Sequence, residues 1–384
     1  MIFPAEDIFL KAPRATPLYS AVASESEANA WTSVNGLSVA RVMTSVDDEY
    51  AAAKSSAVVT DLGALARATV AGPDAAAFLS RLTTAPALQL KLGESARGLM
   101  LDDAGYVVDL AEVSRASQSL FLLTTPTGHP RRLQLAARGL NVEIADISNE
   151  VAALGVFGPK ADDALEKAGL RAPAQNLTAS AVQSGVETSA RPVQFGVIPG
   201  VELLYPRDEA LTLWQRLRRR GGARPIGADA LEVLRIESGA PRPGVDFVPA
   251  ARTHAAIGAK SARLPSEIGL PHLAPVNAGW FNGRRALRHS AGAETRRLTV
   301  LAIDDDRSTP GAAVFAKGKT VGRVTSCAWS PALRRVVAFA DVSATSPYKD
   351  YEISVPSPTE GRVAARLLST PESALAEAHR SDSA

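Results

Sequence analysis

Two acidic residues in otherwise apolar segments are the first candidates for chemistry in this sequence. Asp109 lies in GYVVDLAEV and Glu202 lies in GVELLYP, and both segments are typical of β-strands. Alternate residues of a strand share a face, so Asp109 is expected to share one with Val107 and Ala111. A carboxylate on an apolar face is costly unless it has a partner. Two such carboxylates in one cleft would hold ligand N–H groups and do acid–base work; alternatively, each pairs with an arginine of its own half of the chain.

Other reactive residue types give no comparable pattern. The five histidines are scattered without metal-ligand spacing, so no metal site is predicted. The single cysteine, Cys327, lies in a β-rich segment, which favours a packed side chain over a nucleophile. The sequence has neither a phosphate-binding glycine loop nor a serine in a nucleophile elbow.

The elements that would position the two carboxylates repeat along the chain. A strand, a Gly-Pro pair and a helix occur first in LARATVAGPDAAAFLSRL and again in VAALGVFGPKADDALEKAGL. Pro73 suits the first position of the first helix, because the missing N–H costs nothing there. Each unit is followed by a strand pair and a further helix, at 128–138 and 207–220, and the second pair has a predicted turn near Pro199-Gly200. This order predicts two α/β halves related as a pseudo-repeat, with chance similarity of two short motifs as the alternative.

The remainder of the chain differs in character. A helix is predicted over 227–239, and an irregular Pro/Gly-rich stretch follows over 240–279. From Arg297 onward, short β-prone runs with a hairpin turn at Lys317-Gly318-Lys319 predict a small all-β domain. The predicted domains are 1–150, 151–289 and 290–384.

Composition narrows the functional class. The chain has 384 residues, 46% hydrophobic and 21% charged, which is an ordinary globular mix for two or three domains. A net charge of +2 does not indicate a nucleic-acid partner. One cysteine excludes an internal disulfide, and neither a signal peptide nor a run of ~20 apolar residues is present. We therefore expect a cytoplasmic protein that contacts no membrane.

Colinear segments through most of the chain resemble the glycine-cleavage T-protein (aminomethyltransferase) family. They include VVTDLGALARATVAGPDAAAFLSRLTT, LMLDDAGYVVDLAEV, LGVFGPKA, GVELLYP, PIGADALEVLRIESG, LPSEIGL, FNGRRAL and VGRVTSCAWSPALRRVVAFADV. The resemblance implies an α+β protein with two similar α/β halves and a C-terminal β-barrel. In that three-domain cloverleaf, tetrahydrofolate is the expected cofactor, bound in a central channel.

The resemblance also implies roles for individual residues. Asp109 falls where the family has its key aspartate, which positions the folate nitrogens and the one-carbon unit. Glu202 falls where the family has the glutamate that holds the pterin ring. Phe195 and Thr125 fall at folate-binding positions where the family has a tyrosine and an asparagine. Arg235 and Glu237 match a charged run that is expected to be structural.

The departures bear on the reaction. Phe195 and Thr125 change the pocket, and Leu231 and Arg97 stand where the family has an arginine and a tyrosine. These changes favour a tetrahydrofolate-dependent methyl or methylene transferase of the demethylase-like kind over the glycine-cleavage enzyme. Its expected partners are a small-molecule one-carbon donor and either a protein subunit or further copies of itself.

Two alternatives from the same resemblance stay open. The first is a folate-binding helper of iron–sulfur assembly, but Trp280 stands where that relative has its cysteine. The second is a non-catalytic folate-binding subunit, which the altered pocket residues keep open.

Overall fold

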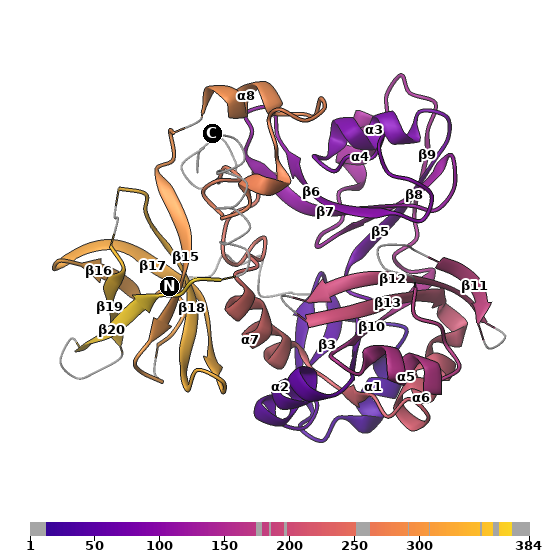
Figure 1. Cartoon of the computed structure of the whole chain (residues 1–384), viewed down its shortest axis with the longest axis horizontal. Helices are drawn as coiled ribbons and strands as arrows, with labels where there is room; N and C mark the ends of the chain where they lie inside the picture. Colours follow the sequence, from indigo (N-terminus) through magenta and orange to yellow (C-terminus); the bar gives the residue numbers. More distant parts are fainter. Residues whose placement is uncertain are drawn as a thin grey trace.

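The structure is a computed structural model and shows two α/β parts beside a β-barrel (Figure 1). It describes residues 13–173, 179–183, 186–195, 198–250, 262–290, 292–306, 308–345, 348–355 and 361–370. The α+β architecture with a closed barrel confirms the predicted fold class.

The first α/β part is a five-stranded sheet with two helices on its outer face (Figure 1). Its strands follow the order β6-β7-β8-β5-β9. Phe78, Leu79 and Leu133 from the helices pack on the sheet in one apolar cluster, here called the outer core of the first sheet. The elements are β5 (Ala66–Ala71), α3 (Ala75–Leu82), β6 (Ser95–Leu101), β7 (Val107–Arg115), β8 (Leu120–Thr125), α4 (Pro130–Ala136) and β9 (Glu143–Asp146).

The second part repeats this plan with one strand added. Its order is β11-β12-β13-β10-β4-β14, so β4 is inserted where the first sheet pairs β5 directly with β9. Its outer face carries two helices, which bury Leu165, Leu213 and Trp214. The elements are β4 (Val58–Asp61), β10 (Val151–Phe157), α5 (Ala161–Lys167), β11 (Ala179–Gln183), β12 (Val186–Phe195), β13 (Ile198–Pro206), η2 (Arg207–Glu209), α6 (Ala210–Arg219) and β14 (Arg224–Pro225).

The Gly-Pro pairs serve the same purpose in both parts. Gly72 has φ 122° and Gly158 has φ 109°, backbone conformations that side chains rarely adopt. A Cβ on Gly72 would lie 2.4 Å from the carbonyl oxygen of Asn141, so only glycine fits this close approach. The prediction for Pro73 is wrong in position, because α3 begins at Ala75 and Pro73 lies before its N-cap residue. The common order of elements supports the predicted pseudo-repeat.

The N-terminal segment packs beside the second sheet. The segment's own three-stranded sheet has the order β1-β3-β2, and β4 pairs antiparallel with β10. The predicted domain boundary at residue 150 therefore does not separate the two sheets, because β4 precedes it in the sequence and belongs to the second sheet. The elements are β1 (Arg14–Ala15), α1 (Tyr19–Glu25), β2 (Ala30–Val34), β3 (Leu37–Val42) and α2 (Val46–Ser55).

The predicted helix at 227–239 is α7 (Ala228–Ser238), which ends at Gly239 in the left-handed conformation. The next described residues contain only short helices, η4 (Pro271–Leu273) and α8 (Arg284–His289), which agrees with the predicted irregular stretch. The turn predicted near Pro199-Gly200 is misplaced, because both residues lie inside β13. The connection itself falls on 196–197, outside the described residues.

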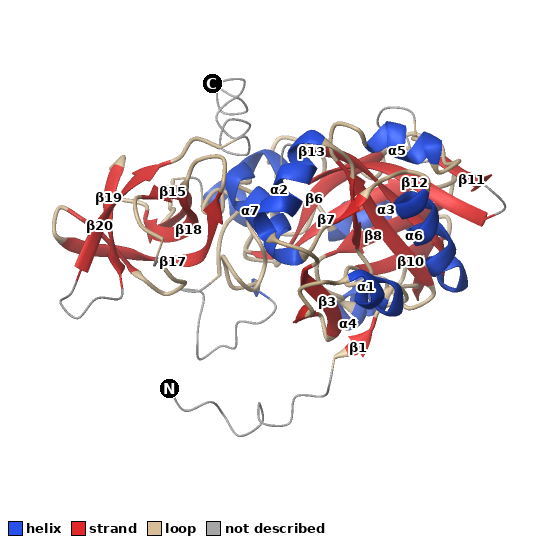
Figure 2. Ribbon diagram, turned by 90° about the horizontal axis from the view of Figure 1, so that it is seen from below, coloured by secondary structure: helices blue, strands red, loops and turns tan. Residues whose placement is uncertain are grey.

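The C-terminal domain is a closed six-stranded barrel, as predicted (Figure 2). Lys317 and Gly318, both with positive φ, form the predicted hairpin turn between β16 and β17. The strands are β15 (Arg296–Ile303), β16 (Ala313–Ala316), β17 (Lys319–Ser330), β18 (Arg335–Ser343), β19 (Asp350–Val355) and β20 (Gly361–Leu367).

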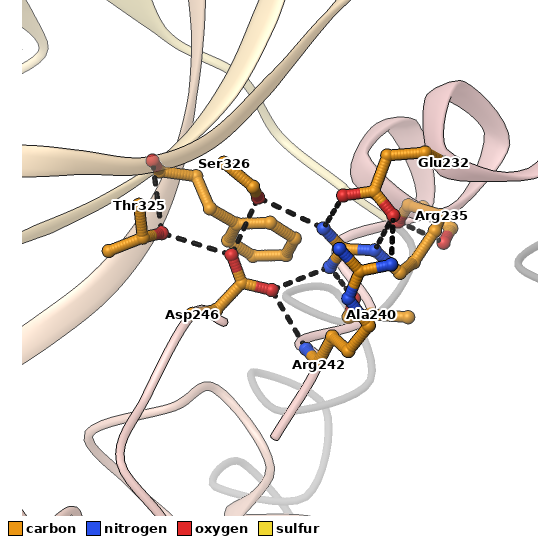
Figure 3. Close-up of polar contacts among 9 residues, drawn as sticks. Glu232, Arg235, Ala240, Arg242, Asp246, Thr325 and Ser326 are labelled. Atoms are coloured by element: carbon orange, nitrogen blue, oxygen red, sulfur yellow. Dashed lines mark hydrogen bonds and ion pairs between the residues drawn. The ribbon is translucent and has the colours of Figure 1, made fainter. Parts of the chain in front are cut away.

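A buried polar network joins α7 to the barrel (Figure 3). Arg235 pairs with Glu232 at 2.7 Å and with Asp246 at 2.7 Å, and it also donates to Ser326 of β17 at 2.9 Å. Glu237, on the same helix, accepts a hydrogen bond of 2.6 Å from Ser330. The contacts of Arg235 and Glu237 therefore connect domains, in line with the structural role expected for them.

Candidate functional site

Asp109 is a fully buried carboxylate in β7. Its Oδ1 accepts a hydrogen bond from the backbone N–H of Leu110 at 2.9 Å. Its Oδ2 accepts from the backbone and the hydroxyl of Thr127, at 3.1 and 2.7 Å, and lies 2.7 Å from Nε2 of His129. Three of these four contacts meet Oδ2, which is therefore fully occupied, whereas Oδ1 has a single backbone donor.

Asp109 points toward the helices of its own part. Ala111 and Val113, which share its strand face, belong to the outer core of the first sheet. Val107 was expected to share this face but lies on the opposite one. A β-bulge in β7 pairs Asp109 and Val107 with consecutive residues of β6, and consecutive residues of a strand point to opposite faces. Glu112 lies on the opposite face and pairs with Arg191 of the second sheet at 2.8 Å.

A cavity of about 110 Å³ lies on the same side of the sheet as Asp109. Thr125 and His129 line it, and Thr125 donates a hydrogen bond of 2.5 Å to the carbonyl of Thr127. The other lining residues are mostly apolar: Ala66, Arg67, Ala68, Met100, Leu123, Gly128, Pro130, Leu133, Gln134, Ile144 and Asp146. Pockets for drug-sized ligands measure roughly 300–1,000 Å³, so this cavity takes only a small molecule or a ligand fragment.

Glu202 lies in a buried ion cluster. Its Oε1 is 2.6 Å from a terminal nitrogen of Arg67, and its Oε2 accepts a hydrogen bond from Nε of Arg191. The side chains of Arg67, Arg191 and Glu202 are at most 3% exposed. Burial disfavours the charged carboxylate, but the attraction of Arg191 and Arg67 outweighs it and lowers the pKa of Glu202 to about 2.

This cluster joins the two α/β parts through equivalent positions. Arg191 and Glu202 are cross-strand neighbours in β12 and β13, as Glu112 and Thr124 are in the matching strands β7 and β8. Arg191 contacts both residues of the first pair: Glu112 at 2.8 Å and the hydroxyl of Thr124 at 3.3 Å. The cluster therefore fixes how the two sheets face each other.

The two carboxylates do not meet in one cleft. Glu202 faces the contact between the sheets, whereas Asp109 lies on the far face of the first sheet. They also lie on non-equivalent strands, since β13 corresponds to β8 and not to β7. The ion-pair alternative holds in part for Glu202, which pairs with Arg191 of its own half and also with Arg67 of the other half. It does not describe Asp109, which pairs with His129.

Phe195 lies at the end of β12, half-buried in an apolar cluster with residues of α2 and α7. Its ring packs edge-on against Phe157, with centroids 5.7 Å apart. Sequence reasoning missed Arg67, Arg191 and His129. A signal for the arginines was present, because a cation within ARATVA or ARPVQF needs an anionic partner as much as Asp109 needs a donor.

No group of three metal-ligating side chains occurs within the described ranges, and no helix there is long and apolar enough to cross a membrane. Cys327 donates a hydrogen bond from its Sγ to the carbonyl of Ser308 at 3.3 Å. Burial, with the negative charge of Glu232, raises the pKa of Cys327 to about 11. A thiol that resists ionisation is a poor nucleophile.

Cys327→Ser should therefore leave turnover and folate binding within about twofold of the parent protein, because a protonated, packed thiol contributes only its volume and a weak hydrogen bond. Steady-state kinetics and calorimetry on the purified variant test this. A large loss of activity with an unchanged melting temperature would instead assign the thiol a chemical role.

Two family models match the chain. The GCVT N-terminal domain covers residues 19–256, more than half of the chain, and the glycine cleavage T-protein C-terminal barrel domain covers residues 296–372. The chain belongs to the glycine-cleavage T-protein family. This membership confirms the resemblance read from the sequence.

Individual relatives agree with the family assignment. The chain is similar to a probable aminomethyltransferase of Haloarcula marismortui, with 29% identity over 93% of this chain and 98% of the relative. It is also similar to an aminomethyltransferase of Moorella thermoacetica, with 28% identity over 85% and 89%. The crystal structure of aminomethyltransferase T from Bartonella henselae matches with a TM-score of 0.82 at 21% identity, covering 94% of this chain and 98% of that chain, and shows the shared fold.

The named relatives are aminomethyltransferases, which are transferases that act with tetrahydrofolate. The expectations of an enzyme and of tetrahydrofolate as its cofactor are thereby confirmed at the level of the family.

Proposed function

We propose that this T-protein relative is a tetrahydrofolate-dependent methyl or methylene transferase of the demethylase-like kind, acting on a small-molecule donor. The observation that carries the proposal is Glu202, a carboxylate kept ionised at the contact between the two α/β parts. Carboxylates of this kind are suited to hold the N–H groups of a pterin. Tetrahydrofolate supplies the nitrogens that accept a one-carbon unit.

The altered pocket residues support the finer distinction from the glycine-cleavage enzyme. The hydroxyl of Thr125 bonds to its own loop, and Phe195, which lacks a hydroxyl, packs against Phe157. Thr125 lines the cavity beside His129 and Phe195 lies in the apolar cluster with Phe157, and neither supplies the amide or phenol group expected of the glycine-cleavage enzyme.

The present arrangement does not fit the whole cofactor. Glu202 has the right chemistry, but each of its oxygens already accepts from an arginine. The cavity beside His129 is smaller than a folate and touches neither carboxylate. Binding of folate therefore requires a rearrangement at Glu202.

The proposal gives Asp109 an indirect role. Asp109 does not line the cavity, so it reaches a reacting molecule there through His129, which does. Asp109 would hold the imidazole hydrogen on Nε2 and keep Thr127 and His129 in place. In these terms Asp109 is a positioning residue, and Thr125 completes the wall beside it.

The test is calorimetric binding of tetrahydrofolate, followed by a screen of methylated sulfur, nitrogen and aryl-ether donors with the folate present. We expect saturable binding in the range typical of enzyme substrates, roughly 1 μM–1 mM, and folate-dependent loss of the methyl group from one donor class. Turnover of the glycine-cleavage intermediate in place of these donors would contradict the demethylase-like assignment. Absence of folate binding by folded protein would contradict the whole proposal.

One observation favours a second candidate, a non-catalytic folate-type subunit. The occupation of both Glu202 oxygens by internal arginines is what a site retained only for structure would show. The iron–sulfur alternative has less support. Trp280, which is 61% exposed, stands where that relative has its cysteine, and the raised pKa of Cys327 disfavours its thiolate.

A further inference from the structure

We infer that Arg67 controls access of folate to Glu202 by occupying the acceptor that the pterin would use, an inference that rests on the proposed pterin role of Glu202. Arg67 comes from β5 of the first part and Glu202 from β13 of the second, and the contact between them is 2.6 Å. Arg67 also lines the cavity beside His129. Of the described residues that line this cavity, Arg67 is the one that contacts Glu202.

A guanidinium and a pterin edge present the same pattern to a carboxylate. Arginine offers N–H donors in a planar fork, and the amino group and adjacent ring N–H of a pterin do the same. The fork of Arg67 belongs to the same chain and is already in position, so it competes with the pterin without any loss of translational freedom. The charge of the guanidinium strengthens its bond further.

Arg67, not Arg191, is the arginine that releases Glu202 when a pterin binds. Arg191 is held by two carboxylates, Glu202 and Glu112. Arg67 has one carboxylate, and its other hydrogen bonds go to the backbone carbonyls of Leu62 and Leu65, each at 3.0 Å. Its Nε is buried and has no hydrogen-bond partner among the described atoms. A buried donor without a partner is unfavourable, so Arg67 is the less completely satisfied of the two arginines.

The ion pairs themselves give the same ordering. The cluster contains two arginines and two glutamates, and the buried carboxyl of Asp61 also attracts Arg67. When Arg67 leaves, Arg191 still neutralises one carboxylate and still bridges the two sheets. When Arg191 leaves, both the bridge to Glu112 and the bond to Glu202 are lost together.

The experiment measures tetrahydrofolate binding by calorimetry to the full chain and to Arg67→Gln. We expect the variant to bind at least about 10-fold more tightly, because the internal competitor for a buried carboxylate has been removed. p-Aminobenzoylglutamate, which lacks the pterin, should bind both proteins equally, because Arg67 competes only for the pterin. Arg115→Gln is the matched control, since Arg115 also bonds to backbone carbonyls of the first part and does not contact Glu202.

The outcomes separate this inference from the proposed function. Equal or weaker binding of tetrahydrofolate by folded Arg67→Gln, with the parent protein binding, overturns the inference and leaves the function standing. Binding by the variant alone supports the inference and assigns the parent chain to the non-catalytic class. Binding by neither overturns both.

A second variant covers the case in which Arg67→Gln fails to fold. Arg67→Gln/Glu112→Gln removes one positive and one negative charge, so the buried Arg191–Glu202 pair remains neutral. The double variant should show the same gain in tetrahydrofolate affinity. A folded double variant without that gain would refute the role of Arg67.

Discussion

Glu202→Gln should lower the free energy of unfolding by about 3–5 kcal/mol, the range for removing one partner of a buried ion pair. The substitution leaves both Arg67 and Arg191 buried at the contact between the two sheets without the carboxylate that joins them. Urea denaturation followed by circular dichroism measures the change. Glu166→Gln is the control, because Glu166 is exposed on α5 of the same part and its loss should matter little.

The pH dependence of this effect has a defined sign. The pKa of Glu202 is lowered from its ordinary value of 4.5 to about 2 in the folded protein. Its stabilising contribution, about 3 kcal/mol from this shift, is therefore complete above pH 4.5 and is lost as the pH falls toward 2. The stability difference between the parent protein and Glu202→Gln should shrink over that window. A difference that stays constant from pH 6 to pH 3 would show that the carboxylate is not held ionised by the arginines.

Asp109→Asn should reduce turnover by about 10²-fold or more, the scale on which loss of one preorganised electrostatic contact acts. An amide cannot replace the charge that holds Thr127 and His129, and it no longer fixes which nitrogen of the imidazole carries the hydrogen. Turnover must be expressed per folded molecule, since the same change also costs about 1–3 kcal/mol of stability through poorly paired donors. Asp103→Asn, in the exposed turn before β7, is the matched control.

A double variant shows whether Asp109 acts through His129. If it does, Asp109→Asn/His129→Gln turns over no more slowly than the slower of the two single variants, because residues that act as a unit are not additive. Losses that multiply would show two separate contributions. Normal turnover per folded molecule in Asp109→Asn alone would remove the residue from the catalytic account.

The sequence was sufficient for the local elements because their signals are local. Period-two patterns located β7 and β13, and the Gly-Pro pairs located the two turns that only glycine can make. The helix starting after Gly227 and the hairpin at Lys317-Gly318 were equally readable, since caps and tight turns depend on a few neighbouring residues. The position of Pro73 was misjudged by two residues, within the usual scatter of helix ends.

What the sequence determined about the site was that Asp109 and Glu202 need partners; the tertiary structure decided which partners they have. Alternation along a strand places two residues on the same or on opposite faces, but it does not say which face packs on helices and which on another sheet. The bulge in β7 reversed the expected relation of Val107 to Asp109, and the sheet-on-sheet contact brought Arg67 to Glu202 from 135 positions away. Such contacts depend on how whole elements pack, and no short segment of sequence records that packing.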